Sequence, residues 1–353
     1  MTHRSGCPPV GWGLVAVLVA VAACGGGTER RLDSDVPMRR VTAPMGDLFD
    51  LAWLSDDRLY FGRSVDPADA GTWRVPAAGG AGERLRLPDR PGCRRTEYFR
   101  VQPMPDGQLG LTRYCTTEYP EAADTPFATD TGVVDPRSVR FRPLAPLGDL
   151  NPVSVTWRRG LREGFVSYTT GSCAGMAPLT RQGPQRLPDP VTLDGRTWRL
   201  DEDVIGPGID CADRGRAVLP VLSPDERQLY FLASPESMGV SGSYAREETP
   251  WRLYRWTLTE GRPSGQPQQL TGDLGKPQDL AIAPAGRSLA FAGQRHGRYG
   301  LWLVDTSTGA LRRLARGKVM AAAFSPDGHQ VAMIFQHDAD HCYLYVLDLP
   351  DPQ

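Results

Sequence analysis

Lysine and histidine are scarce in this sequence, and neither sign of charge is in excess. Among 353 residues there are five histidines, and only Lys276 and Lys318 of the 40 basic residues are lysines. The 41 acidic residues bring the net charge to −1. A nucleic-acid-binding protein needs a basic surface to neutralise phosphates, so this balance argues against that class. It also gives no long-range field to attract a charged substrate.

Long hydrophobic runs are absent as well. The longest apolar run is residues 14–23, which are ten residues long and follow His3 and Arg4. A transmembrane helix needs about 20 apolar residues. A run of this length after a weakly positive start is typical of a secretory signal peptide.

The run ends in Val21-Ala22-Ala23-Cys24, followed by three glycines. This pattern resembles the bacterial lipobox. The resemblance implies that residues 1–23 are a lipoprotein signal peptide and that Cys24 carries the lipid, including palmitate-type chains. It also implies a membrane anchor on the extracytoplasmic side of the cell envelope. An ordinary signal peptide with a coincidental cysteine is the alternative. We expect residues 24–37 to be a flexible tether.

Cysteine usage agrees with export. Of seven cysteines, Cys7 lies in the signal peptide and Cys24 at its end, which leaves five. No C-x-x-C pair and no Cys/His spacing of the zinc type occurs. Thiols outside the cytoplasm usually form disulfides, and an odd number leaves one thiol free. The connectivity stays open at this point.

A strand–turn–strand pattern recurs along the chain. The clearest copy has apolar residues 321–324, the turn Ser325-Pro326-Asp327-Gly328, and apolar residues 330–335. Proline presets φ, aspartate accepts local hydrogen bonds and glycine allows positive φ, so this is a turn by its chemistry. The six turns begin near residues 55, 105, 158, 224, 284 and 326. Four-stranded units repeating every 40–60 residues or so indicate an all-β protein with a β-propeller fold.

The turn at Ser325, the strand Leu289-Ala290-Phe291 and the strand Leu301-Trp302-Leu303-Val304-Asp305 resemble the TolB-type, WD-like propeller repeat. The resemblance covers most of residues 38–349 and implies six blades in a domain of residues 38–353. A hairpin pattern at residues 191–200 leaves a seventh blade open. The last unit lacks a fourth strand, so we expect residues 38–43 to complete it and close the ring.

In such a propeller, the connections into each first strand and those between second and third strands share one face. This arrangement pairs Cys93 with Cys115 and Cys173 with Cys211, and leaves Cys342 free. Neighbouring loops can bring Cα atoms within the roughly 7 Å that a disulfide needs.

Candidate catalytic and metal-binding residues are few. His337, Asp338, Asp340 and His341 are possible metal ligands, although these residue types also stabilise turns without a metal. Gly-Ser-Cys173-Ala-Gly resembles a nucleophile elbow, but its neighbours are strands rather than a strand and a helix. No phosphate- or dinucleotide-binding glycine loop occurs, so we expect no cofactor.

These observations predict a non-catalytic, lipid-anchored propeller that binds a protein or peptide partner. The alternative is a propeller enzyme or a binder of sugars or other small ligands, because propellers support many chemistries.

Overall fold

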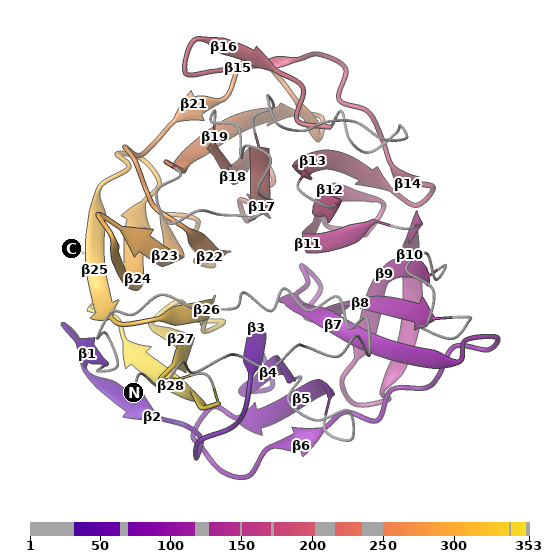
Figure 1. Ribbon diagram of the computed structural model, residues 1–353, viewed down its shortest axis with the longest axis vertical. Helices are drawn as coiled ribbons and strands as arrows, with labels where there is room; N and C mark the ends of the chain where they lie inside the picture. The colour runs from indigo at the N-terminus through magenta and orange to yellow at the C-terminus, as the bar shows by residue number, and fades with distance from the viewer. Residues whose placement is uncertain are drawn as a thin grey trace, which may run out of the picture.

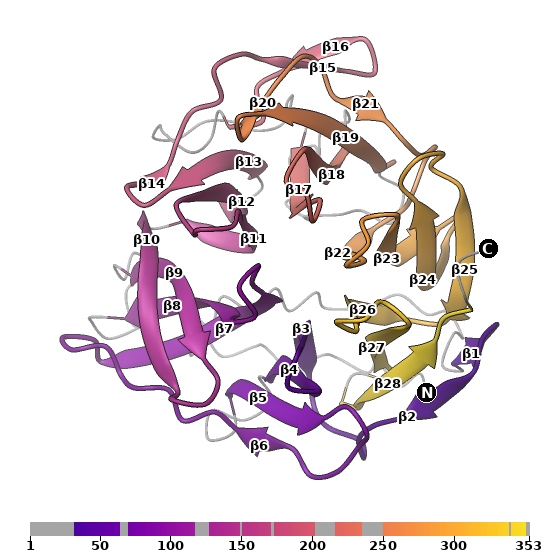
Figure 2. The same ribbon diagram turned by 180° about the vertical axis from the view of Figure 1, so that it is seen from behind.

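The computed structural model describes residues 32–63, 70–116, 127–148, 150–170, 173–201, 216–234, 250–338 and 340–350. The expected signal peptide and Cys24 therefore lie outside the described residues. Six sheets stand around a central axis like the blades of a propeller (Figures 1 and 2). Within the described ranges there is no helix, and so none that could cross a membrane. The prediction of an all-β, six-bladed propeller is confirmed.

The first three blades follow each other along the chain, each with its first strand nearest the axis. Blade 1 contains β3 (Leu48–Leu54), β4 (Arg58–Arg63), β5 (Gly71–Pro76) and β6 (Glu83–Arg84). Blade 2 contains β7 (Arg95–Pro103), β8 (Leu109–Thr116), β9 (Phe127–Asp135) and β10 (Arg140–Gly148). Blade 3 contains β11 (Asn151–Trp157), β12 (Glu163–Thr170), β13 (Cys173–Thr180) and β14 (Gly183–Pro184).

The last three blades repeat this order with additions at their outer edges. Blade 4 contains β17 (Arg216–Leu222), β18 (Gln228–Ser234), β19 (Arg252–Thr259), β20 (Arg262–Pro263) and β21 (Gln268–Gln269). Blade 5 contains β22 (Pro277–Ile282), β23 (Ser288–Arg295), β24 (Arg298–Asp305) and β25 (Leu311–Arg316). Blade 6 contains β26 (Val319–Phe324), β27 (Gln330–Gln336) and β28 (Cys342–Asp348).

The N-terminal segment closes the ring. Strand β2 (Met38–Arg40) pairs antiparallel with β28, so the predicted closure is confirmed. The pairing continues past β2, where the Val41 N–H donates to the Leu344 carbonyl at 2.8 Å. Strand β1 (Asp33–Ser34) pairs with β25 of blade 5, so these two residues belong to the propeller and not to the expected tether of residues 24–37. The two short strands thus join blades 5 and 6 at their outer edges.

The turns between first and second strands form as their sequence predicts. In the last blade the Ser325 hydroxyl donates to Asp327 at 2.6 Å, and this bond lowers the pKa of the Asp327 carboxyl. Gly328 has φ of 77°, which glycine adopts without strain. Turns of adjacent blades also touch, since Arg158 Nε lies 3.2 Å from a carboxylate oxygen of Glu226.

The core lies between blades rather than in one central layer. Middle strands such as β27 are buried over most of their length, because both of their faces pack against neighbouring blades. The predicted hairpin forms as β15 (Val191–Leu193) and β16 (Arg196–Trp198). Its apolar side chains pack with blades 3 and 4, so it covers their junction and adds no seventh blade.

Candidate functional site

The first strands of the six blades bring equivalent residues to the propeller axis. In each blade a tight turn joins the first strand to the second, and its hydrogen bond is accepted by the carbonyl of the turn's first residue. Each residue of the set lies four positions before that first residue. Next to each of them, the pairing between the first and second strands shifts its register. We call this set the axial ring. It consists of Asp50, Arg100, Ser154, Leu219, Asp279 and Ala321. Bulges of this kind re-aim side chains and occur often beside functional sites.

Side chains from alternate blades tie the ring together. The Asp50 carboxylate accepts the Arg100 backbone N–H at 2.7 Å, which joins blades 1 and 2. The Asp279 carboxylate accepts the Ala322 N–H at 2.8 Å, which joins blades 5 and 6. Between blades 3 and 4, the Leu219 N–H donates to Ser167 Oγ at 3.2 Å. Blades 1, 3 and 5 therefore each supply a side-chain acceptor to the next blade.

The charge of Arg100 balances that of Asp50. Its Nη1 lies 3.5 Å from Asp50 Oδ1, and its Nε donates to the Pro152 carbonyl at 2.8 Å, so one guanidinium bridges three blades. The two side chains are 19% and 17% exposed. Burial raises the pKa of Asp50, while the charge and hydrogen bonds of Arg100 oppose the rise.

Asp279 has no such counter-charge in the axial ring. Burial raises its pKa to about 7, and the nearby negative charge of Asp50 adds to this. Backbone N–H groups of Leu280 and Ala322 bind its carboxylate and oppose the shift. The residue as a whole is partly buried, and its carboxyl has a pKa near neutrality.

Three half-buried aromatic side chains lie beside the ring on blades 1 and 2. We call them the aromatic row: Phe49, Phe99 and Tyr114. The ring centroids of Phe49 and Phe99 are 5.4 Å apart, and those of Phe99 and Tyr114 are 5.7 Å apart. The first contact crosses from blade 1 to blade 2, the second lies within blade 2, and all three residues are only partly buried.

A disulfide holds the strand that carries Tyr114. Cys93 and Cys115 are bonded as expected, with 5.3 Å between their Cα atoms. The other expected pair cannot be placed, since Cys211 and the side chain of Cys173 lie outside the described residues. Cys342 is a free, buried thiol, and burial raises its pKa to about 11.

The histidine-rich segment of blade 6 forms a compact turn. The Asp338 carboxylate accepts the Asp340 N–H at 2.9 Å and lies 2.8 Å from His341 Nδ1. The His337 ring instead contacts Phe335 and Tyr343. Throughout the part of the chain that the structure describes, no three His, Cys, Asp or Glu side chains gather as metal ligands would.

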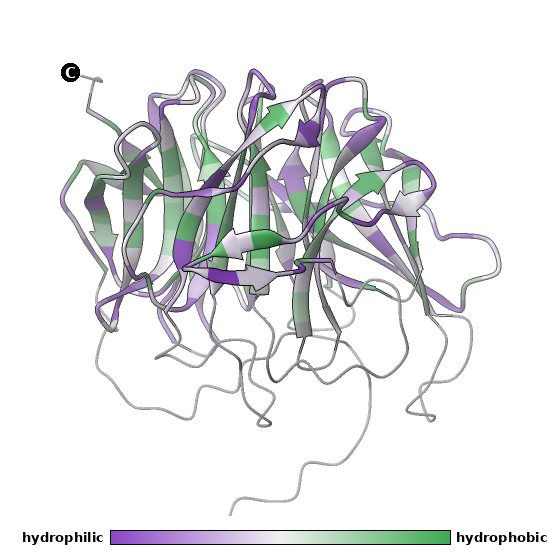
Figure 3. Cartoon of the chain, turned by 90° about the horizontal axis from the view of Figure 1, so that it is seen from above, coloured by the Kyte–Doolittle hydropathy of each residue, from purple (hydrophilic) through white to green (hydrophobic). Residues whose placement is uncertain are grey.

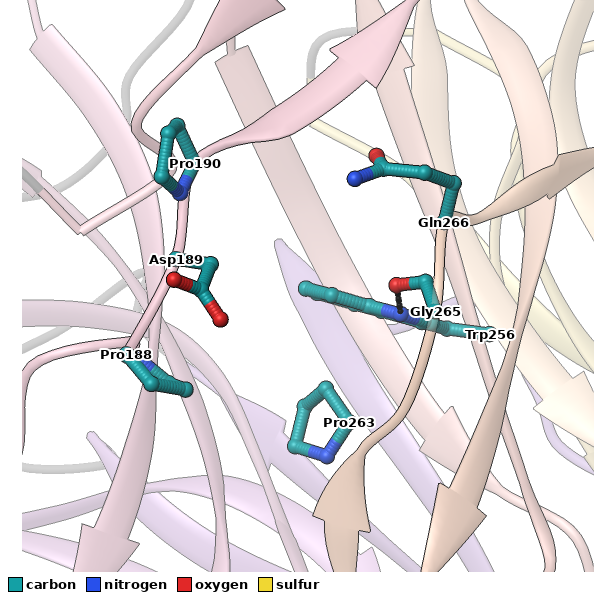
Figure 4. A pocket seen from close by; sticks show the side chains of 7 residues that line it. All are labelled: Pro188, Asp189, Pro190, Trp256, Pro263, Gly265 and Gln266. Carbon is teal, nitrogen blue, oxygen red and sulfur yellow. Dashed lines mark hydrogen bonds between the residues drawn. The ribbon is translucent and has the colours of Figure 1, made fainter.

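One small pocket lies on the outer rim, beside the β15–β16 hairpin (Figure 4). It has a volume of about 190 Å³, which is below the range of typical ligand sites. The Trp256 indole is 4% exposed and donates to the Gly265 carbonyl at 2.9 Å, so its ring face is not open to a ligand. The residues that line the pocket are Pro188, Asp189, Pro190, Trp256, Pro263, Gly265 and Gln266.

The axial carboxylates were missed in the sequence, although a signal exists. Both stand in the same tripeptide, Asp50-Leu51-Ala52 and Asp279-Leu280-Ala281, just before a first turn. Arg100 has no such signal, because only the register of its blade places it beside Asp50.

Comparisons with known proteins identify the fold. No protein-family model matches the chain, and no curated protein matches it. A gluconolactonase of Xanthomonas campestris is similar in structure, with 13% identity, a TM-score of 0.53 and coverage of 90% of both chains. TolB of Acinetobacter baumannii has 13% identity and a TM-score of 0.49, covering 86% of this chain. A putative TolB of Agrobacterium tumefaciens has 14% identity and a TM-score of 0.49, covering 86% of this chain and 91% of its own.

These likenesses concern the propeller scaffold. The chain spans 63% of the Acinetobacter TolB, which is less than two thirds of that protein. At such low identity the shared feature is the fold, which hosts many unrelated functions.

Proposed function

We propose that this chain is a lipid-anchored, extracytoplasmic propeller that binds a protein or peptide partner without catalysis. The aromatic row carries the proposal. Phe49, Phe99 and Tyr114 form a contiguous row of partly buried aromatic rings on a rigid frame. Aromatic side chains of this kind contribute most of the energy in many protein interfaces.

The charges around the axis fit a scaffold role. The Asp50 carboxylate and the Arg100 guanidinium bind each other and backbone groups of neighbouring blades. A general acid or base has to exchange protons with a substrate, whereas these groups hold blades together. Recognition therefore falls to the surface beside them.

Site-specific photo-crosslinking tests the proposal in intact envelopes. A photoreactive amino acid replaces Phe99 in one variant, and in a control it replaces Arg227, which is exposed on a first turn of blade 4. We expect a discrete protein adduct from position 99 and none from position 227. With the partner identified by mass, Phe99→Ala should weaken binding about tenfold or more. Equal adducts at both positions, or none at position 99, would contradict the proposal.

A hydrolytic enzyme is the second candidate, and Asp279 favours it. A carboxyl with a pKa of about 7 suits a general base at neutral pH. The similar gluconolactonase suggests a sugar lactone as the first substrate to try. Hydrolysis of gluconolactone above the buffer rate, abolished by Asp279→Asn in a folded variant, would favour the enzyme over the binding module.

A further inference from the structure

The described chain begins on a defined face of the propeller. Asp33 pairs with Arg316, the last residue of β25, and Ser34 pairs with Ala315. Just beyond Arg316 the chain passes from blade 5 to blade 6. We call this side the loop face; it includes residues 295–298, 317–318, 337–338 and 340–341. The turns between first and second strands lie on the opposite side, the turn face (Figure 3).

The distance between the expected anchor and this face is short. Cys24 and Leu32 are eight residues apart in the sequence. Eight residues reach at most about 28 Å when fully extended, and about 16 Å as a flexible chain. A seven-residue strand such as β28 adds about 23 Å between the two faces. The loop face is therefore the nearer one to any lipid attached at Cys24.

Three arginines lie at the rim of the loop face beside this entry point, with the carboxylate of Asp33 next to one of them. Arg298 and His296 are exposed on the turn between β23 and β24. Arg316 is 54% exposed, and its Nη1 lies 4.0 Å from a carboxylate oxygen of Asp33. Arg295 lies half-buried against Trp302, with 5.6 Å from its guanidinium carbon to the ring centroid. Exposed arginines next to a bilayer bind anionic headgroups.

We propose that the loop face of blade 5 lies on the membrane surface, with Arg298 and Arg316 against phospholipid phosphates. The proposal rests on lipid attachment at Cys24. It orients the molecule, since the turn face then points away from the bilayer. The aromatic row lies toward the loop-face end of blades 1 and 2, as the neighbouring Cys115 shows, so its partner has to reach into the space next to the membrane.

Depth-dependent quenching tests this orientation on the full acylated chain in vesicles. A fluorescent amino acid replaces His296 on the loop face or, as the matched control, His329 on the turn face; both residues are exposed. The vesicles contain anionic phospholipid and a headgroup-attached quencher. We expect quenching at position 296 to be at least threefold stronger than at position 329. Equal quenching at the two positions, or none at either, overturns the proposal.

The arginines are tested by neutralisation. Arg298→Gln with Arg316→Gln should bring the quenching ratio close to one, and the ratio should also fall when anionic lipid is replaced by zwitterionic lipid. Arg227→Gln with Arg262→Gln on the turn face should leave the ratio unchanged. An unchanged quenching ratio in the loop-face variant would refute the contact between these arginines and the lipid headgroups. Mass analysis of the Cys24 peptide separates the lipid anchor from the orientation. If the peptide carries no acyl groups, both proposals are refuted. If it is acylated and quenching is equal at the two positions, only the proposed orientation is refuted.

Discussion

The carboxylate of Asp279 in blade 5 accepts the backbone N–H of Ala322 in blade 6 at 2.8 Å. Blade 6 is the one that β2 completes, so this bond supports the ring where its two ends meet. The carboxylate is also the axial group whose pKa rises to about 7. Stability at this junction is therefore linked to pH.

Asp279 should make the protein less stable as pH rises. Its folded pKa of about 7 lies above the usual aspartate value of 3.8, so the folded state holds the proton more tightly than the unfolded state. Folding stability from this group is present below pH 4 and falls between about pH 4 and 7, by up to about 1.4 kcal/mol per pH unit. Thermal melts of wild type and Asp279→Asn should show a difference that changes across this window. A constant difference between pH 4.5 and 8 would refute the link.

The Cys93–Cys115 disulfide should stabilise blade 2. It closes a loop with a sequence separation of 22, which corresponds to about 3 kcal/mol in the chain-entropy account. Replacing both cysteines by serine should lower the free energy of unfolding by that amount in urea. Reductant should destabilise the wild type in the same way and have no further effect on the double variant at this site.

The thiol of Cys342 should be unreactive in the folded protein. It is 1% exposed, and its pKa of about 11 leaves little thiolate at pH 8. Alkylation with iodoacetamide, read out on the Cys342 peptide by mass spectrometry, should be slow in buffer and fast in denaturant. Rapid labelling of the native protein would show that β28 opens at its first residue.

Removal of residues 36–44 should weaken the ring strongly. The deletion removes β2 and the buried Val41, together with the bond between the Leu344 N–H and Thr42 Oγ1 at 3.2 Å. We expect a fall in Tm of about 10 °C or more. Arg40→Ala is the matched control, because it keeps the backbone pairing and loses only the contact with Tyr343, so its Tm should change by about 2 °C or less.

The repeat made the scaffold predictable from sequence. Turns such as Ser325-Pro326-Asp327-Gly328 fix where each first strand ends, and the missing strand of the last unit pointed to closure by residues 38–43. The extra pairing of β1 with β25 was not predictable, because two residues carry no periodic pattern. The predicted tether, residues 24–37, therefore extends too far, since residues 33–34 pair with blade 5.

The axial site was harder to predict. Asp50 and Asp279 look like ordinary strand residues until the bulges aim them at neighbouring blades. The contact between Phe49 and Phe99 joins residues 50 positions apart, so it depends on how the blades pack. Spacing along the chain located the strands, whereas contacts between blades decided which side chains meet.

Both the binding role and the membrane orientation depend on lipid at Cys24. Intact mass spectrometry of the protein from a detergent-extracted membrane fraction tests this most directly. We predict a mature chain that begins at Cys24 and carries the mass of two or three acyl chains. A mature chain that begins at another residue, or one that begins at Cys24 without acyl groups, would contradict the account.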